Sequence, residues 1–328
     1  MLGIDGSMGE GGGQVLRTAL CVACVMGKPV RVSNIRAGRE NPGLRAQHLT
    51  ACNLLSEITG GKLEGASIGS QEITFTPGKI SGGEFSFDIG TAGSCTLLLQ
   101  AALPVLLHAP SPCSLRIKGG THVRGAPTYE YFSEVFLPAI RRFGAACESE
   151  LMAHGFYPKG GGEIAVRTKP SKLSGCKFEP EGGRQAHYSI ISSSLPESVA
   201  AREEKAVEET LGRKFDLRGK AAAVNSLGAG NAVSIWSGTH GGCAIGERGK
   251  PAEQVAREAC ADFLAGAGKG AVDAHLADQL LAYAALAEGG SGFSAHEFTE
   301  HAKTNAEVLR RTTGRNIILG GEGKIEVF

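Results

Sequence analysis

Two kinds of segment follow one another along the chain. The short ones alternate apolar and polar residues, and the longer ones carry apolar residues at helical spacing. Residues 27–35 (GKPVRVSNI) and 71–80 (QEITFTPGKI) alternate as strands do. Residues 41–60 (NPGLRAQHLTACNLLSEITG) carry apolar residues at helical spacing, with Pro42 near the start and Gly60 just past the end. This order of elements predicts an α+β fold.

Three apolar helices are predicted directly after turns rich in glycine or small residues. They lie in 9–20 (GEGGGQVLRTAL), 90–103 (GTAGSCTLLLQAAL) and 270–287 (GAVDAHLADQLLAYAALA). A helix that recurs in the same local setting indicates a repeated α+β unit. We therefore expect a fold built from such units, although the identity between them is low.

The composition changes near residue 180, where the polar segment EPEGGRQAH begins. A strand (188–194), a helix (196–212), a strand (229–237) and a helix (251–268) are predicted after it. Beyond residue 268 the sequence returns to the pattern of the first half. We therefore predict a small α/β domain at 184–268, inserted into a discontinuous larger domain of residues 1–183 and 269–328.

Composition and charge exclude some classes of protein. The chain has 328 residues, 34 Lys and Arg against 33 Asp and Glu, and a net charge of +1. A protein that coats nucleic acid by bulk electrostatics needs an excess of cations, so any contact with nucleic acid must be local. Nine cysteines, mostly within apolar segments, suit buried thiols in a reduced cytoplasm. The longest apolar run is too short and too interrupted for a membrane helix, so no membrane partner is expected.

Arginines surround two of the predicted turns. Glu10, Gln14 and Arg17 surround the first glycine-rich turn. The turn before the second helix carries Arg36, Arg39, Arg45 and Gln47. Backbone amides at helix starts and nearby guanidinium groups bind phosphate, although turns with solvated arginines would have the same spacing.

Two further positions are open to a chemical or a structural interpretation. Asp278 and Gln279 interrupt the start of an apolar helix, where a carboxylate either complements the helix dipole or handles metal or protons. His301 follows Thr299, a suitable N-cap residue. A lone histidine in such a position is more often structural than catalytic.

Six motifs, in order and at similar spacing, resemble those of RNA 3'-terminal phosphate cyclases. They are DGSMGEGGGQVLRTAL, IRAGRENPGLRAQHLTA, GTAGSCTLLLQ, KGGT followed by AP, HGFYPKGGGE and HLADQL. The resemblance covers essentially the whole chain. It implies a large domain of three repeated βαβαββ-like units, similar to those of enolpyruvyl transferases, with a small α/β domain inserted before the third.

The resemblance makes His301 the catalytic residue, since the family adenylates the histidine of an H-x-x-T-N pattern that here includes Thr304 and Asn305. It implies ATP and a divalent metal, Mg or Mn, as cofactors. AMP would pass from the α-phosphate of ATP to His301, and then to an RNA 3'-phosphate that closes to a 2',3'-cyclic phosphate. A related branch of ribosome-biogenesis proteins lacks this histidine.

The resemblance also assigns the other site residues. The nucleotide would be held by Gln14, Pro127, His275, Asp278, Gln279, Thr304 and Asn305; the substrate phosphates by Arg17, Arg36, Arg39 and Gln47; and the metal by Glu10 and Asp278. Two positions depart from bacterial members. His275 stands where those have an adenine-stacking tyrosine, and Arg124 adds a cation near Pro127.

The sequence therefore predicts a cytoplasmic, ATP-dependent RNA 3'-phosphate cyclase that acts on RNA with a 3'-terminal phosphate. Two alternatives are a non-catalytic RNA-binding or ribosome-biogenesis homologue and a transferase for a small phosphorylated metabolite. Whether the protein forms a homodimer is a question that the sequence leaves open.

Overall fold

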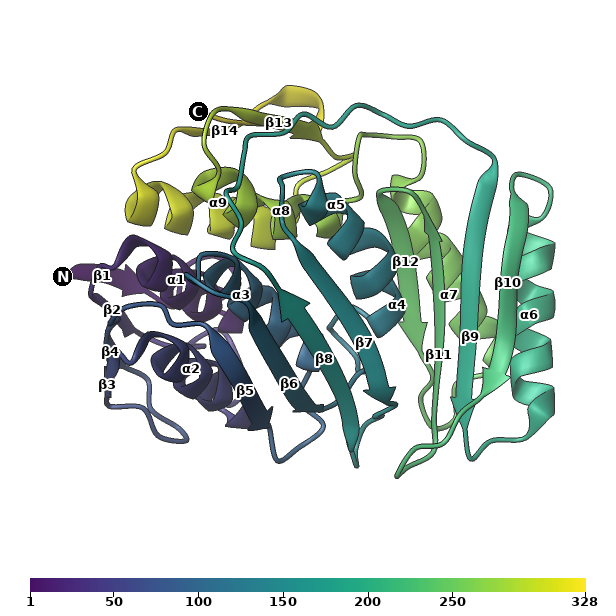
Figure 1. Cartoon of the computed structure of the whole chain (residues 1–328). Helices are drawn as coiled ribbons and strands as arrows, with labels where there is room; N and C mark the ends of the chain where they lie inside the picture. The colour runs from purple at the N-terminus through teal and green to yellow at the C-terminus, as the bar shows by residue number, and fades with distance from the viewer.

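A computed structural model describes residues 1–328, and it divides the strands among four sheets whose surrounding helices give an α+β fold (Figure 1). The first unit consists of β1 (Leu2–Asp5), α1 (Gly13–Met26), β2 (Val30–Ser33), α2 (Ala46–Thr59), β3 (Lys62–Glu64) and β4 (Ile73–Thr76). Its sheet has the order β1-β2-β4-β3. β1 runs parallel to β2, and the other pairs are antiparallel.

The second unit repeats this topology strand for strand. It consists of β5 (Gly83–Asp88), α3 (Cys95–Leu107), β6 (Cys113–Gly119), α4 (Tyr129–Tyr131), a π-helical turn (Phe132–Phe136), α5 (Leu137–Arg141), β7 (Cys147–Ala153) and β8 (Gly162–Thr168). The order β5-β6-β8-β7 again has one parallel pair followed by two antiparallel pairs. The predicted βαβαββ repeat is thus present in both units.

The third unit is split in two: its first strand-like segment, residues 174–178, is separated from the rest of the unit by residues 185–266. α8 (Ala274–Leu286), β13 (Ser291–Ser294), α9 (Glu300–Thr313), β14 (Ile317–Leu319), a short 3-10 turn (Gly321–Gly323) and β15 (Lys324–Val327) make up its last part. The segment 174–178 runs parallel to β13, with bridges from Ser174 to Glu288 and from Lys177 to Gly292. It therefore occupies the place that β1 has in the first unit. The insertion interrupts the third unit and does not precede it as we expected.

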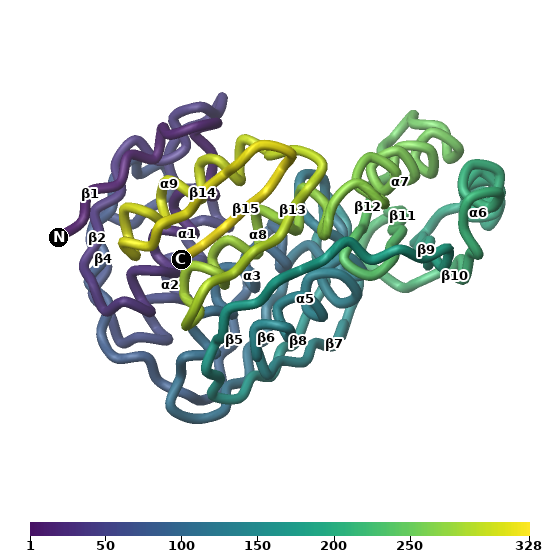
Figure 2. Tube along the Cα trace, turned by 90° about the horizontal axis from the view of Figure 1, so that it is seen from above, coloured from purple at the N-terminus to yellow at the C-terminus, as the bar shows by residue number.

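Residues 185–266 form the inserted unit, which contains the fourth sheet. Its elements are β9 (Gln185–Ser193), α6 (Glu197–Leu211), β10 (Asp216–Ala223), β11 (Gly230–Ser237), β12 (His240–Ile245) and α7 (Ala252–Gly266). The strand order is β10-β9-β11-β12, and α6 and α7 pack on one face of it over a separate cluster of 15 buried apolar residues. In Figure 1 this sheet stands beside the sheet of the second unit, and in Figure 2 it lies at one end of the molecule.

The three units together form the larger part of the molecule, and their helices pack against one another at its centre. α3 is buried on every side, including Leu98, Leu99 and Leu103, as its nearly continuous apolar sequence requires. α1 and α9, from opposite ends of the sequence, pack side by side (Figures 1 and 2). This packing brings the N-terminal turns of α1, α3, α8 and α9 close together. None of the helices has the length and apolar character needed to span a bilayer.

Two local predictions differ from the structure. α2 begins at Ala46, so Pro42 lies in the preceding loop and not in the first helical turn. That loop needs a left-handed residue at Gly43 (φ +79°), whose amide donates to the Ile35 carbonyl, and this conformation cannot belong to a helix. Strands β10 and β12 were missed because alanine and glycine, which rarely favour strands, make up half of each.

Candidate active site

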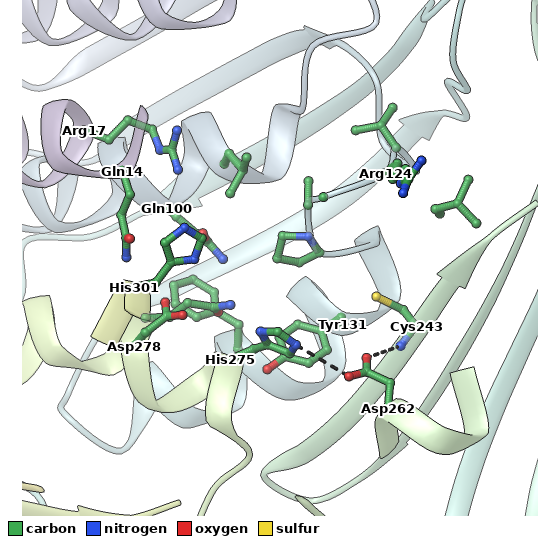
Figure 3. A pocket seen from close by; sticks show the side chains of 18 of the residues that line it. Gln14, Arg17, Gln100, Arg124, Tyr131, Cys243, Asp262, His275, Asp278 and His301 are labelled. Atoms are coloured by element: carbon green, nitrogen blue, oxygen red, sulfur yellow. Dashed lines mark hydrogen bonds and ion pairs between the residues drawn. The ribbon is translucent and has the colours of Figure 1, made fainter. Parts of the chain in front are cut away.

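A cavity of about 580 Å³ lies between the helices of the larger part and the inserted unit. The larger part contributes α1, α3, α4, the π-helical turn, α8, α9 and the loop 123–127, and the inserted unit contributes β12, α7 and the loop between them. Its volume is within the usual range for small-molecule sites. Figure 3 shows His301, Gln14 and Asp278 at one end and Arg124 and Cys243 at the other.

His301 reaches this cavity from the first turn of α9. Thr299 caps the helix as predicted, because its hydroxyl accepts the amide of Ala302 at 2.9 Å. The imidazole is 42% exposed, and its Nε2 lies 3.3 Å from Oε2 of Glu10. A ligand in the cavity therefore has access to the ring.

The environment keeps this imidazole neutral. Burial lowers the pKa of His301 below its ordinary value of 6.5. The Glu10 carboxylate opposes this change, whereas the cations of Arg17 and Arg39 lower the pKa further. A neutral imidazole has the free electron pair that a nucleophile needs.

The glycine-rich turn before α1 allows close packing of the groups behind His301. A β-carbon on Gly12 would lie 2.9 Å from Nη2 of Arg39, and one on Gly13 would lie 2.1 Å from Nε2 of His48. Nη2 of Arg39 in turn lies 3.1 Å from Oε2 of Glu10. The absence of side chains at these two glycines therefore leaves room for Arg39, Glu10 and His301 to lie in a row.

Arg17 is a cation without a protein partner on the cavity wall. It makes no hydrogen bond or ion pair in the structure, and it lies on α1 near His301 (Figure 3). Burial lowers its pKa to about 10, against the pull of the Asp278 carboxylate. The guanidinium stays charged at neutral pH and is free to bind an anionic ligand.

Asp278 is a buried carboxyl on the opposite helix, α8. Burial raises its pKa to about 7, although His275 and Arg17 favour the charged form. Its Oδ2 accepts a hydrogen bond of 3.4 Å from the Thr299 hydroxyl. At neutral pH the cavity wall therefore carries Asp278 in both its protonated and its ionised form.

Three glutamine side chains line the cavity with unsatisfied buried atoms. Oε1 of Gln14, Nε2 of Gln100 and Oε1 of Gln279 have no hydrogen-bond partner. Buried amide atoms without partners are costly in a folded protein, so these atoms indicate a polar ligand. Gln100 was not predicted, although a single glutamine within the apolar helix α3 was the signal that could have found it.

His275 and Pro127 both line the cavity near the inserted unit. Nε2 of His275 lies 3.5 Å from Oδ1 of Asp262 on α7, and this interaction raises the pKa of His275 to about 9. The other oxygen of Asp262 accepts the Cys243 amide at 3.0 Å. His275 is therefore an imidazolium at neutral pH, so it differs from tyrosine in charge as well as in size.

The two residues that follow His301 in the H-x-x-T-N pattern have structural partners. Asn305 lines the cavity, but its amide accepts from the Thr18 hydroxyl at 2.7 Å and donates to the Asp278 carbonyl at 3.2 Å. It therefore links α1, α8 and α9. The Thr304 hydroxyl donates to the Glu300 carbonyl, and Thr304 packs against Gly9 outside the cavity wall.

Three of the predicted phosphate-binding residues, and their neighbours Glu10 and Arg45, also lie outside the cavity wall. Nη1 of Arg36 donates to the carbonyls of Asn41 and Gly43, at 2.6 and 2.9 Å, and so supports the loop before α2. Gln47 accepts the Ser94 amide at 2.8 Å, at the start of α3. Glu10 and Arg39 lie behind His301, and Arg45 is the N-cap residue of α2. The side chains of Arg36, Arg39, Glu10 and Gln47 are paired with protein atoms, unlike that of Arg17.

Sequence reasoning missed several polar residues. His48 is packed among Arg17, Arg36 and Arg45, and burial together with these cations lowers its pKa to about 3. Asp262, Glu258 and Lys250 line the cavity from the inserted unit, and no motif marked them. Arg124, which the sequence did mark as an added cation near Pro127, reaches the same wall and lies 3.5 Å from Glu247.

The predicted metal residues do not form a protein-only metal site. No group of three or more His, Cys, Asp or Glu side chains is arranged to hold an ion. Oε2 of Glu10 lies between Arg39 and His301, while Asp278 is buried on α8. Glu10 could supply one carboxylate to an ion that is held mainly by phosphate oxygens, which is how proteins usually bind Mg²⁺.

Comparisons with known proteins identify the family. The model of a family described as RNA 3'-terminal phosphate cyclase matches residues 8–319. A protein of that name from Archaeoglobus fulgidus is 42% identical over 327 residues, which cover 98% of each chain. One from Pyrococcus furiosus is 41% identical over 339 residues, covering 99% of this chain and 97% of the relative. The chain belongs to the RNA 3'-terminal phosphate cyclase family.

Among solved structures, the enolpyruvyl transferase NikO from Streptomyces tendae matches with a TM-score of 0.39 and 11% identity. The match covers 99% of this chain but 47% of the NikO chain. This chain thus spans about half the length of that one, and a likeness at this level carries no argument about function.

The pKa of His301 gives a prediction that can be tested without RNA. In an NMR titration we expect the imidazole of His301 to titrate below pH 6.5, because burial disfavours its charged form. Arg39→Ala removes a cation and should raise this pKa. Lys303→Ala, on the same helix with its ammonium paired to Glu300, should leave it unchanged. A midpoint at or above 6.5 in the wild type would contradict a neutral histidine.

Proposed function

We propose that this chain is an ATP-dependent RNA 3'-phosphate cyclase that works through a histidine-AMP intermediate on His301. The observation that supports this proposal best is the pairing of a neutral, accessible imidazole with the partnerless Arg17 in one cavity. The family of the chain supplies the substrate class, RNA with a 3'-terminal phosphate.

The proposed first step forms a bond between an imidazole nitrogen of His301 and the α-phosphorus of ATP. The bond from that phosphorus to pyrophosphate breaks, and pyrophosphate leaves. Arg17 offsets the negative charge that repels the nucleophile. The unsatisfied amides of Gln14, Gln100 and Gln279 would hydrogen-bond the nucleotide, and His275 and Pro127 would flank its base.

In the second step an oxygen of the RNA 3'-phosphate attacks the same phosphorus, and the bond to His301 breaks. In the third step the neighbouring 2'-OH loses its proton and attacks the RNA phosphorus, and AMP leaves with the bonding electrons. These steps need the reacting groups held close together and their phosphate charges offset. A divalent ion, Mg²⁺ or Mn²⁺, would supply further charge neutralisation at the phosphates, with Glu10 as its protein carboxylate.

The deciding experiment is incubation with α-labelled ATP and Mg²⁺, followed by a denaturing gel. We expect a labelled protein band that is acid-labile and base-stable, and that loses its label when 3'-phosphorylated RNA is added. RNA that ends in a 3'-OH is the control and should leave the label in place. The absence of a covalent label would instead favour a non-catalytic RNA-binding homologue. A label that RNA does not discharge would favour transfer to a small phosphorylated metabolite.

A further inference from the structure

A second cavity, of about 480 Å³, lies between the inserted sheet and the second unit of the larger part. One wall is the face of β9, β10 and β11 that points away from α6 and α7. The other wall is formed by α4, the π-helical turn and Leu151 of β7. None of the site residues predicted from the sequence lines it. We call this cavity the sheet groove.

Three side chains form a row across the strands of the sheet groove. In the register of the sheet, Arg218 is paired with His187, and His187 is paired with Trp236. Directly paired residues point to the same face. The rings of His187 and Trp236 stack, with centroids 5.7 Å apart and planes 17° apart. The row therefore presents a guanidinium followed by two aromatic rings.

This row is not part of the hydrophobic core of the inserted unit. The alternate residues Tyr188, Ile190 and Ile235 fill the cluster beneath α6 and α7. Trp236 is only partly buried, with one side packed against the core cluster of the larger part, and Arg218 is exposed. Large aromatic groups left at the wall of a cavity commonly bind ligands.

The cations of the sheet groove have no anionic partner within the protein. Lys220 lies two residues from Arg218 on the same strand and face, and neither forms an ion pair. The side-chain oxygen of Gln185 accepts hydrogen bonds from Nε and Nη1 of Arg218, at 3.2 and 3.3 Å, but this partner is neutral and leaves the charge of Arg218 uncompensated. On the opposite wall Glu130 is bonded to buried His122 at 2.8 Å, and Glu134 accepts from the Ser133 hydroxyl at 3.1 Å. The positive charge thus lies along β10, at the open edge of the sheet.

Aromatic faces beside a row of cations are the means by which proteins bind single-stranded RNA. The bases stack on the rings, while the cations contact the phosphates. α4 and the turn after it border both cavities: Tyr131 and Phe136 line the active-site cavity, whereas Tyr129 and Ser133 line the sheet groove. The sheet groove is therefore next to the place where the RNA end would react.

We propose that the sheet groove binds single-stranded RNA upstream of the 3'-phosphate, with a base on Trp236 and phosphates at Arg218 and Lys220. This inference rests on the proposed function, because it assigns the inserted unit a role in holding the same RNA. It predicts that RNA length affects binding and leaves the chemistry unchanged. A dinucleotide fills the active-site cavity alone, whereas a longer strand also reaches the groove.

Trp236 is the only tryptophan of the chain, so its fluorescence reports from the sheet groove itself. We expect a 3'-phosphorylated strand of about 12 nucleotides, which is within the usual site size for single strands, to quench this fluorescence on binding. A 3'-phosphorylated dinucleotide should not quench it. Equal signals for both lengths, or none for either, would overturn the proposal. A change that follows protein concentration without RNA would instead assign the groove to contact between copies of the chain.

Steady-state kinetics provides the second test. Trp236→Ala should raise KM for the long strand about 10-fold, the effect of losing one stacked base. The double variant Arg218→Ala/Lys220→Ala should also raise this KM, because it removes two phosphate contacts. The kcat, the KM for the dinucleotide and self-adenylation should not change. Trp236→Phe keeps an aromatic face and should recover most of the binding. Lys205→Ala on α6, at the opposite face of the sheet, is the matched control and should behave as wild type.

The failures of the two proposals can be told apart. If all variants keep the wild-type KM for the long strand, the RNA path does not cross the sheet groove, whereas cyclisation by the wild type would still support the proposed function. If long RNA quenches Trp236 but the wild type cyclises nothing, the groove binds RNA and the proposed function is wrong.

Discussion

His301→Ala and His301→Asn should abolish both self-adenylation and the cyclisation of RNA from ATP. Each variant removes the only nucleophile proposed to receive AMP, and neither alanine nor asparagine offers a nitrogen with a basic electron pair. The same variants should still cyclise RNA that is supplied already adenylated at its 3'-phosphate. The last step needs the 2'-OH held close to the phosphorus and the leaving AMP stabilised, which does not require the histidine.

Two assays decide this prediction, a labelled-ATP gel and a cyclisation assay with adenylated RNA. His296→Ala is a suitable control, because this histidine lies before α9 and outside the cavity wall. It should retain self-adenylation. Failure of the His301 variants on adenylated RNA, in a protein that folds and binds it, would give His301 a part in ring closure. Label on a lysine in the wild type would contradict the assignment entirely.

Arg17→Ala should slow self-adenylation by a factor of about 10² to 10³, the usual cost of removing one preorganised charge that stabilises a transition state. It should also slow the reaction of pre-adenylated RNA, because both reactions develop negative charge at a phosphate in the same cavity. The pattern would thus differ from that of His301. Arg17→Lys keeps the charge but loses the planar fork, so we expect only partial recovery.

Arg17 has no hydrogen-bond partner, so truncating it leaves no buried group unpaired. We therefore expect the unfolding temperature of Arg17→Ala to stay close to that of the wild type, which a thermal melt would verify. Arg31→Ala is the control for the loss of an arginine, since Arg31 is exposed and paired with Glu72 away from the cavity. Equal self-adenylation by Arg17→Ala and Arg31→Ala would remove Arg17 from the proposed mechanism.

Much of the candidate site could be predicted from the sequence through motif resemblance. Gln14, Arg17, His275 and Gln279 do line one cavity with His301, as the resemblance implied. Their chemical roles stay predictions, as do the roles given to Glu10, Pro127 and Asp278. The domain boundaries at 184–268 also stay a prediction, which the separate apolar cluster of the inserted unit supports.

The residues that were missed belong to contacts between distant segments. Gln100 and His48 lie within two of the six motifs, but the motifs assigned no role to either, and their significance comes from the groups packed around them. β12 was missed because of its glycines, yet the structure gives these a reason. A β-carbon on Gly241 would lie 2.6 Å from the Tyr131 ring, and one on Gly242 would lie 2.2 Å from the Phe263 nitrogen. Gly241 therefore allows β12 to approach α4 of the larger part, whereas Gly242 allows β12 to pack closely on α7 within the inserted unit.

The sequence by itself determined the local features of this protein: where α9 begins at the Thr299 cap, where α2 ends at Gly60, and the alternation of its strands. These follow from short-range hydrogen bonding and from the apolar period, which involve neighbouring residues only. Only the tertiary structure decided that Arg17 is without a partner while Arg36 supports a loop, and that Trp236 lies in a row with Arg218. The sequence spacing of these residues does not specify their partners, because the partners come from segments that only the packing of helices and sheets brings together.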